Sequence, residues 1–258
     1  MLKRFLLLCL LPLAPTLARA TDFTDIWYIP AESGWGVNVV QSNSFLFLTF
    51  FIYGPDNKPT WYTANLTAAA GGSFSGKLYA TTGTYYAVPW KPSDLTQTEV
   101  GTATFQPTSN FTANLTYVLT AGSVTVNKAI QRQTLTTIPL SGLYIGGQAG
   151  QYAGANCAIK GSYTDTLRLQ AVQTDGPAIT LSFTYDASGQ SCTLTGTMAQ
   201  LGKVYTVPGA AYQCRSGINT TAVIDDLRAT SLGIEGRFFA ADLGNGCSES
   251  AAFSAVMR

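Results

Sequence analysis

Residues 27–40 read WYIPAESGWGVNVV, residues 45–53 read FLFLTFFIY and residues 60–62 read TWY. Three of the four tryptophans lie in this stretch, and the turn-forming segments 42–44 and 54–59 separate its apolar runs. Short runs rich in aromatic and β-branched residues, bounded by Gly, Pro, Asn and Ser, are typical of strands. The stretch therefore predicts the opening meander of a β-barrel or a β-sandwich.

Residues 45–53 are apolar on both alternating faces, whereas a half-exposed strand alternates apolar with polar residues. We therefore expect this strand to be covered on both sides, inside by a core and outside by the second half of the chain. The two faces comprise Phe45, Phe47, Phe51 and Tyr53 on one side, and Leu46, Leu48, Phe50 and Ile52 on the other.

Strand patterns continue along the whole chain, and no segment shows a helical period. Residues 111–120 give the cleanest alternation, and the turn 121–123 leads from them into a further strand. The composition changes near residues 138–142: all four tryptophans precede this point, and four of the five cysteines follow it. We predict an all-β protein of two consecutive antiparallel meander barrels, or barrel-like sandwiches, of about seven to eight strands each. The first occupies residues 21–138 and the second residues 139–258.

The first twenty residues have the features of a signal peptide. Lys3 and Arg4 precede an apolar run over residues 5–13, and Ala18-Arg19-Ala20 forms a cleavage site. Neither this run nor any later stretch is long enough to cross a bilayer as a helix. We expect an exported protein, periplasmic or extracellular, that begins at Thr21.

Four cysteines remain after cleavage, and an even number in an exported chain predicts two disulfides. Cys192 and Cys214 are equally distant from position 203, beside the Gly202-Lys203 turn, so they would face each other in a simple hairpin. The spacing therefore favours Cys192–Cys214, with Cys157–Cys247 as the remaining pair. The other two connectivities stay open.

The charge balance and the absence of histidine exclude several classes of function. Without the three basic residues of the signal peptide, 15 − 3 = 12 basic residues face 14 acidic ones, a net charge of −2. This argues against binding of nucleic acids. The chain has no histidine, which removes Ser-His-Asp and Cys-His catalysis and the commonest zinc sites. We expect no enzymatic activity, no metal and no cofactor.

The string W-Y-x-P-x-E-S-G-W-G-x-N over residues 27–38, with Phe51, Tyr53 and residues 58–62, resembles a motif of uncharacterised secreted proteins of Gram-negative bacteria. The resemblance covers about 40 residues and implies no known activity. The architecture is also similar to avidin-like and lipocalin-like barrels. This second likeness concerns the fold alone, since fold does not imply function and no residues match a biotin site.

Aromatic residues of the first half are candidates to line a pocket mouth and stack on a ligand, although core and strand-edge packing is the commoner reason for such residues in a barrel. Glu32 is expected to bind a ligand or to pair with Lys58 or Lys77, and Asn38 to point into the barrel. Gly34 and Gly36 indicate close backbone packing around Trp35. The candidate ligand-binding residues are Trp27, Glu32, Trp35, Asn38, Trp61, Tyr62, Tyr85 and Trp90.

Three functional hypotheses follow. The first is a binding module for a small apolar molecule, a glycan or an envelope protein; the second is a structural or interaction protein with solid-packed barrels. The third is a hydrolase that uses Asp225, Asp226 and Glu235. Glycoside hydrolysis needs two carboxylates facing one cleft, and adjacent residues of a regular strand point to opposite faces. The third hypothesis is therefore the least favoured.

Overall fold

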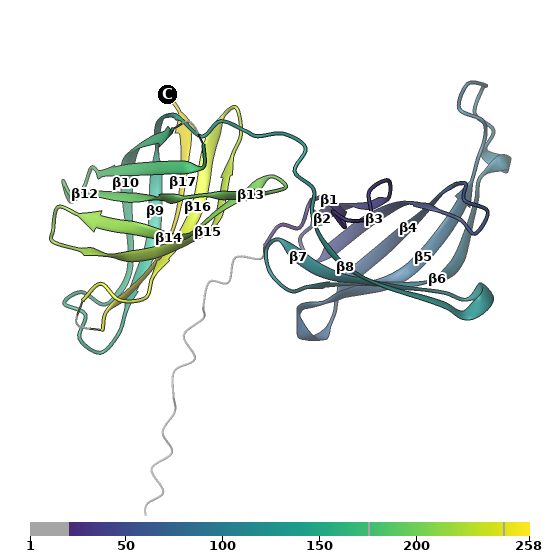
Figure 1. Cartoon of the computed structure of the whole chain (residues 1–258), viewed down its shortest axis with the longest axis horizontal. Helices are drawn as coiled ribbons and strands as arrows, with labels where there is room; N and C mark the ends of the chain where they lie inside the picture. Colours follow the sequence, from purple (N-terminus) through teal and green to yellow (C-terminus); the bar gives the residue numbers. More distant parts are fainter. Residues whose placement is uncertain (1–20, 175, 245) are drawn as a thin grey trace, which may run out of the picture.

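Figure 1 shows the computed structural model of the chain, in which residues 21–174, 176–244 and 246–258 are described. Two antiparallel β-barrels follow one another along the chain, which confirms the predicted fold class. The first sheet spans residues 25–132 and the second residues 142–257, so the expected boundary near residue 138 falls in the connecting segment. The predicted signal peptide lies outside the described residues.

The first barrel is an eight-stranded meander in which each strand pairs with its sequence neighbours, and β1 pairs with β8 to close the ring. Residues 25–28, at the start of the motif stretch, supply the closing strand. The strands are β1 (Asp25–Tyr28), β2 (Gly36–Ser42), β3 (Phe45–Tyr53), β4 (Pro59–Ala68), β5 (Phe74–Thr82), β6 (Thr96–Pro107), β7 (Thr112–Leu119) and β8 (Val124–Arg132). Three short 3-10 turns interrupt the loops: η1 (Ala70–Gly72), η2 (Pro92–Asp94) and η3 (Ala121–Ser123).

The second barrel has the strand order β12-β11-β10-β9-β17-β16-β15-β14, and a β12–β14 pairing closes it. The short β13 pairs with the start of β14 and forms a hairpin with it. The strands are β9 (Gly142–Ala153), β10 (Gly161–Gln173), β11 (Ala178–Tyr185), β12 (Ser191–Thr197), β13 (Ala199–Leu201), β14 (Val204–Cys214), β15 (Asn219–Ala229), β16 (Gly233–Ala240) and β17 (Ser248–Met257).

Inward-facing apolar side chains fill both barrels. Trp27, Phe50 and Phe105 are the largest fully buried apolar residues of the first, and the Phe105 ring meets the Trp27 ring edge-on with centroids 5.1 Å apart. In the second, Phe183, Phe238 and Phe253 lie in one continuous cluster. Burial of such side chains is the main favourable contribution to folding.

The expectation that β3 is covered on both sides is wrong. Leu46, Leu48 and Phe50 point into the core, but the opposite face of the strand is open to solvent. The reason lies in the connection between the barrels: residues 133–141 leave the first barrel from the end of β8, so the second barrel lies beyond one end of the first. It does not lie over the flank that β3 forms.

Both predicted disulfides are present. Cys192 and Cys214 are direct partners in the β12–β14 ladder with their Cα atoms 4.0 Å apart, and Cys157 and Cys247 are bridged at 4.9 Å. None of the helical turns in the described part of the chain has the length or hydropathy needed to cross a membrane. The two disulfides are compatible with an exported protein.

The two barrels meet at a defined junction. The β13–β14 turn contacts the start of the first barrel, where the Lys203 amide donates to Asp25 Oδ2 at 3.1 Å and the Gly202 amide donates to Thr134 Oγ1 at 3.0 Å. A β-carbon on Gly202 would come within 2.2 Å of Asp25 Oδ2, so only glycine fits this approach. From here on, the end of the first barrel at this junction is called the near end, and the opposite end the far end.

Candidate interaction surface

A charged cap covers the far end of the first barrel. Lys128 occupies an inward position of β8, opposite the buried Leu115. Its Nζ lies 2.6 Å from Glu32 Oε2 and 5.5 Å from the centroid of the Trp35 ring, while Trp35 Nε1 donates to the same carboxylate at 3.1 Å. The hydrogen bond from Lys128 lowers the pKa of Glu32. Glu32 therefore pairs with Lys128, and the expected pairing with Lys58 or Lys77 is wrong.

A second cap of the same kind closes the near end. Arg132 lies four residues further along β8, again inward, and its guanidinium stacks over the Trp27 ring at 5.0 Å. It forms a fully buried ion pair with Asp25 at 3.1 Å and donates to the carbonyl oxygens of Asn110 and Asp22. Burial lowers the pKa of Arg132, and the charge of Asp25 opposes that effect. A cation, a tryptophan ring and a carboxylate thus cover each end of the interior.

The sequence motif of residues 27–38 contributes Trp27, Glu32 and Trp35 to these caps, and its two glycines answer local steric demands. A β-carbon on Gly36 would lie 2.6 Å from Phe51 Cζ and 2.9 Å from the Trp27 carbonyl oxygen, while Gly34 has a φ of +104°. Both glycines serve close packing and a left-handed backbone, as the sequence indicated.

The predicted site residues do not converge on one cavity. Trp27 is core, Glu32 and Trp35 belong to the far cap, and Tyr62 is half-buried against the core. Asn38 is exposed on the outside of β2, so the prediction that it points into the barrel is wrong. Trp61 is exposed on the outside of β4, and Tyr85 and Trp90 are exposed in the β5–β6 loop.

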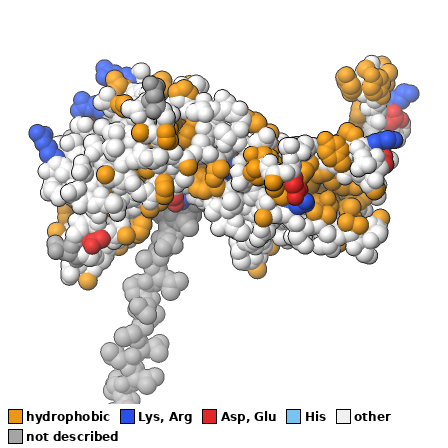
Figure 2. Space-filling model, in the orientation of Figure 1, with side chains coloured by type: hydrophobic (Ala, Val, Ile, Leu, Met, Phe, Trp, Pro, Cys, Tyr) orange, Lys and Arg blue, Asp and Glu red, His pale blue; other side chains and the backbone are white. Residues whose placement is uncertain are grey.

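Large apolar side chains gather instead on the outside of β2, β3 and β4. Cross-strand pairing places Val40 beside Phe47, and Phe51 beside Trp61. The exposed fractions of these four side chains run from 39% to 54%. None of the outward positions of the three strands carries a charge. We call this surface the outer aromatic face: Val40, Phe45, Phe47, Phe51, Tyr53 and Trp61. Figure 2 shows hydrophobic side chains gathered on the first barrel.

The other flank of the same barrel has different chemistry. The outward positions of β6, β7 and β8 are mostly threonine and asparagine, and Thr116 donates to the side chain of Asn127 at 2.7 Å across two of these strands. The aromatic character is therefore confined to one flank. Sequence reasoning missed this surface because it assigned the second face of residues 45–53 to burial, although the doubly apolar pattern was its signal.

The loop between β5 and β6, residues 83–95, projects from the far end as an arm (Figure 1). Internal hydrogen bonds fix its shape: the Lys91 amide donates to Thr84 Oγ1 at 2.9 Å, and that hydroxyl donates to Asp94 Oδ2 at 3.0 Å. Its exposed apolar residues are Tyr85, Tyr86, Val88, Trp90 and Leu95, with Tyr86 92% exposed. The arm thus presents aromatic side chains to solvent on an ordered support.

The three candidate catalytic carboxylates do not form a matched pair in a cleft. A register shift in β15 between Ile224 and Arg228 breaks the regular alternation, so that both Asp225 and Asp226 reach Arg237, at 3.4 and 3.8 Å. Burial raises the pKa of Asp225, and the charge of Arg237 opposes this rise. Asp226 also pairs with Arg228 at 2.8 Å. Within the described residues, no group of three or more Asp, Glu, Cys or His side chains is placed to hold a metal ion.

The interior of the second barrel holds a carboxylate that sequence reasoning missed. Glu249 is fully buried and accepts hydrogen bonds from the hydroxyls of Tyr163 and, at 3.0 Å, Tyr212. Gln148 links Tyr163 to Tyr185 through its amide group. Burial raises the pKa of Glu249 against the opposing effect of these hydrogen bonds, and burial together with the Glu249 charge raises the pKa of Tyr152 to about 12. The sequence indicated this burial only through the alternation of the last strand, in which residue 249 falls on the same side as the inward-facing Ala251 and Phe253.

Comparison of the chain with protein-family models, curated proteins and solved structures finds no match.

Proposed function

We propose that this protein is a non-enzymatic interaction protein of the cell envelope or the extracellular space. In this proposal, the first barrel docks a partner protein through the outer aromatic face and the arm. The observation that carries the proposal is the uncharged aromatic flank of β2–β4. Aromatic residues are enriched and charged residues depleted at the cores of protein interfaces. Exposed apolar side chains gathered on one flank are typical of an interaction site, and the row Asn38, Thr49 and Thr63 that crosses this face is polar but uncharged.

The closed interior favours an external site over a ligand inside the barrel. Trp27, Phe50 and Phe105 occupy the interior, and the Lys128 and Arg132 caps cover its ends. A closed barrel also offers no free strand edge for a partner to extend. The partner is therefore expected to contact side chains of the flank, with Trp61 and the arm residue Trp90 as the strongest single contributors because tryptophan dominates interface energetics.

Site-specific photo-crosslinking tests this proposal in cells that export the protein. A photoreactive residue replaces Phe47 or Trp61 on the outer aromatic face, and matched controls carry it at Thr104 or Thr116 on the threonine flank. We expect one discrete adduct with another protein from positions 47 and 61 and none from the controls. The substitution Phe51→Thr should remove the adduct, since loss of a central aromatic contact weakens binding by about 2 kcal/mol or more.

Two outcomes would contradict the proposal. Equal labelling from both flanks would mean that the aromatic face has no preferred partner, and an adduct of the chain with itself would identify self-association instead.

A further inference from the structure

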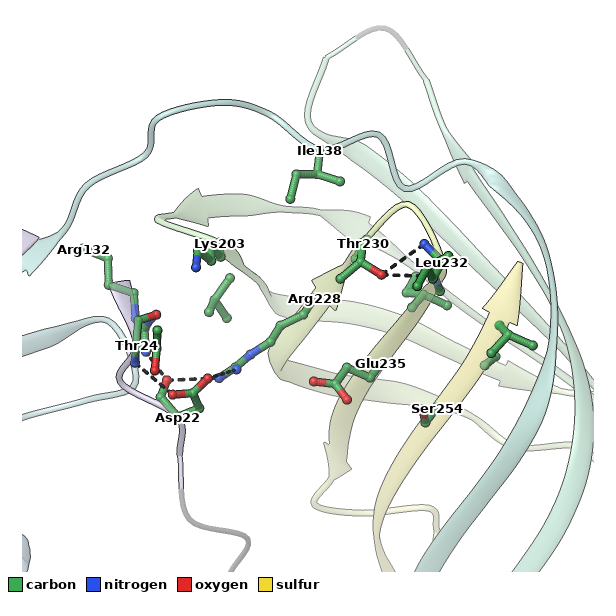
Figure 3. A pocket seen from close by; sticks show the side chains of 16 residues that line it. Asp22, Thr24, Arg132, Ile138, Lys203, Arg228, Thr230, Leu232, Glu235 and Ser254 are labelled. Atoms are coloured by element: carbon green, nitrogen blue, oxygen red, sulfur yellow. Dashed lines mark hydrogen bonds and ion pairs between the residues drawn. The ribbon is translucent and has the colours of Figure 1, made fainter. Parts of the chain in front are cut away.

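A pocket of about 650 Å³ lies at the junction of the two barrels (Figure 3). The N-terminal segment of the first barrel forms one side through Asp22 and Thr24. The ends of β14, β15, β16 and β17 form the other sides. The volume falls in the range of small-molecule sites, which are often found between domains. None of the residues singled out for the outer aromatic face or the arm lines it.

The charged groups of the pocket divide into those that already have protein partners and those that do not. Asp22 and Arg228 pair at 3.3 Å, and Arg132 is committed to Asp25. Hydrogen bonds from Thr24 and the charge of Arg228 lower the pKa of Asp22 in spite of its burial. Among the described residues, the side chains of Glu235 and Lys203 form no ion pair. The pocket thus offers one carboxylate and one ammonium group to a ligand.

The two groups lie on different walls, with apolar surface between them. Lys203 precedes β14 and Glu235 belongs to β16; Figure 3 shows the Glu235 carboxylate directed toward the side where Arg228 and Asp22 lie. The accessible apolar lining comes from Ile138, Leu232 and Val256, of which Leu232 and Val256 are well exposed. A hydroxyl at Ser254 adds a neutral hydrogen-bonding group.

We propose that this pocket binds a short peptide with free termini, whose ammonium end pairs with Glu235 and whose carboxylate end pairs with Lys203. A zwitterion satisfies both charges at once, whereas a simple anion or cation leaves one of them without a partner. A single amino acid fills only a fraction of the 650 Å³, whereas a peptide of a few residues fills more of it and places side chains on the apolar lining. This site is independent of the proposed docking of a protein partner.

Titration calorimetry with the tripeptide Ala-Leu-Ala tests the proposal on the mature protein. The N-acetylated peptide and the C-terminal amide are the matched ligands, since each removes one terminal charge. We expect Glu235→Gln to weaken binding of the free tripeptide about tenfold, because a charge-assisted hydrogen bond becomes a neutral one. The same variant should not alter binding of the acetylated peptide, which has no ammonium end. Lys203→Gln should likewise weaken binding of the free tripeptide but leave binding of the C-terminal amide unchanged.

Glu99→Gln and Lys58→Gln serve as protein controls, since both residues lie on the first barrel outside the pocket. Unchanged thermal unfolding of all variants, followed by circular dichroism, would show that the fold is intact. Absence of binding of the free tripeptide at millimolar concentration would overturn the proposal. So would an affinity that neither Glu235→Gln nor Lys203→Gln changes.

Discussion

The first barrel encloses a wholly apolar centre between two cation–tryptophan–carboxylate caps, whereas the second is cross-linked by two disulfides and encloses a buried glutamate among tyrosines. Lys128 and Arg132 sit at the ends of the first interior, where their charges reach a carboxylate. Glu249 lies inside the second and depends on hydroxyl donors. The comparison teaches that charge is tolerated at a barrel end through ion pairing and within a barrel through hydrogen bonding.

The two barrels can be followed separately in solution. All four tryptophans belong to the first barrel, at positions 27, 35, 61 and 90, so tryptophan fluorescence reports its unfolding. The strands of the second barrel contain no tryptophan, and far-ultraviolet circular dichroism adds its contribution to the combined signal.

The largest effect is expected from Arg132→Met. The substitution leaves Asp25 buried without its ion-pair partner and removes the donors to the carbonyl groups of Asn110 and Asp22. Loss of one member of a buried pair costs about 3–5 kcal/mol, so the midpoint of tryptophan-detected urea unfolding should fall strongly. Lys77→Met is the control, because its pair with Glu99 belongs to the same barrel but is solvent-exposed, and such a pair contributes little to stability. Equal shifts in the two variants would contradict the role of the near cap.

A smaller effect, confined to the second barrel, is expected from the double variant Cys192→Ala/Cys214→Ala. The bridge links residues 22 positions apart, and removal of such a disulfide costs roughly 2–4 kcal/mol. The transition seen by circular dichroism should move to lower urea, while the tryptophan transition stays in place. A matching shift of the tryptophan signal would mean that the barrels unfold as one cooperative unit.

The smallest effect concerns pH and Glu249. Because burial raises its pKa in the folded state above the ordinary value of 4.5, the folded protein holds this proton over a pH range where the unfolded chain has lost it. The stabilisation is complete below pH 4.5 and is lost as the pH rises through the folded-state pKa, by about 1.4 kcal/mol for each unit of the shift. Glu249→Gln should remove this dependence from the circular-dichroism transition. If the urea midpoint of the second barrel in the wild-type protein does not fall between pH 4.5 and 7, the raised pKa of Glu249 is refuted.

Much of the fold is predictable because strand periodicity is a local property. The alternation of residues 111–120 corresponds to β7, and the equal distance of Cys192 and Cys214 from position 203 matches their direct pairing. The irregularity of β15 was not predictable in this way. It depends on how Arg228 and Arg237 receive Asp225 and Asp226, and the sequence alone does not specify a bulge.

The candidate site was less predictable than the fold. The aromatic side chains within residues 27–62 were predicted as site candidates, but the sequence does not say which of them close the barrel interior and which face solvent. Sequence reasoning missed Lys128: it shares the inward face of β8 with Val126 and Ile130, but its partner Glu32 lies 96 residues away, where no local pattern identifies it. Ion pairs between residues so far apart in the sequence form only when β1 pairs with β8 and closes the barrel.

The sequence by itself determined an all-β chain in two halves, because strand periodicity is local, and the absence of histidine chemistry, because that is a matter of composition. Its spacing favoured the Cys192–Cys214 pair but left the other connectivities open. Tertiary structure decided the rest: which face of β3 stays exposed, how Glu32 and Asp25 find their cations, and where the inter-barrel pocket opens. The physical reason is that burial and ion pairing depend on what lies opposite a side chain in space. For β3, the chain leaves the barrel at the end of β8 and carries the second barrel away from that flank.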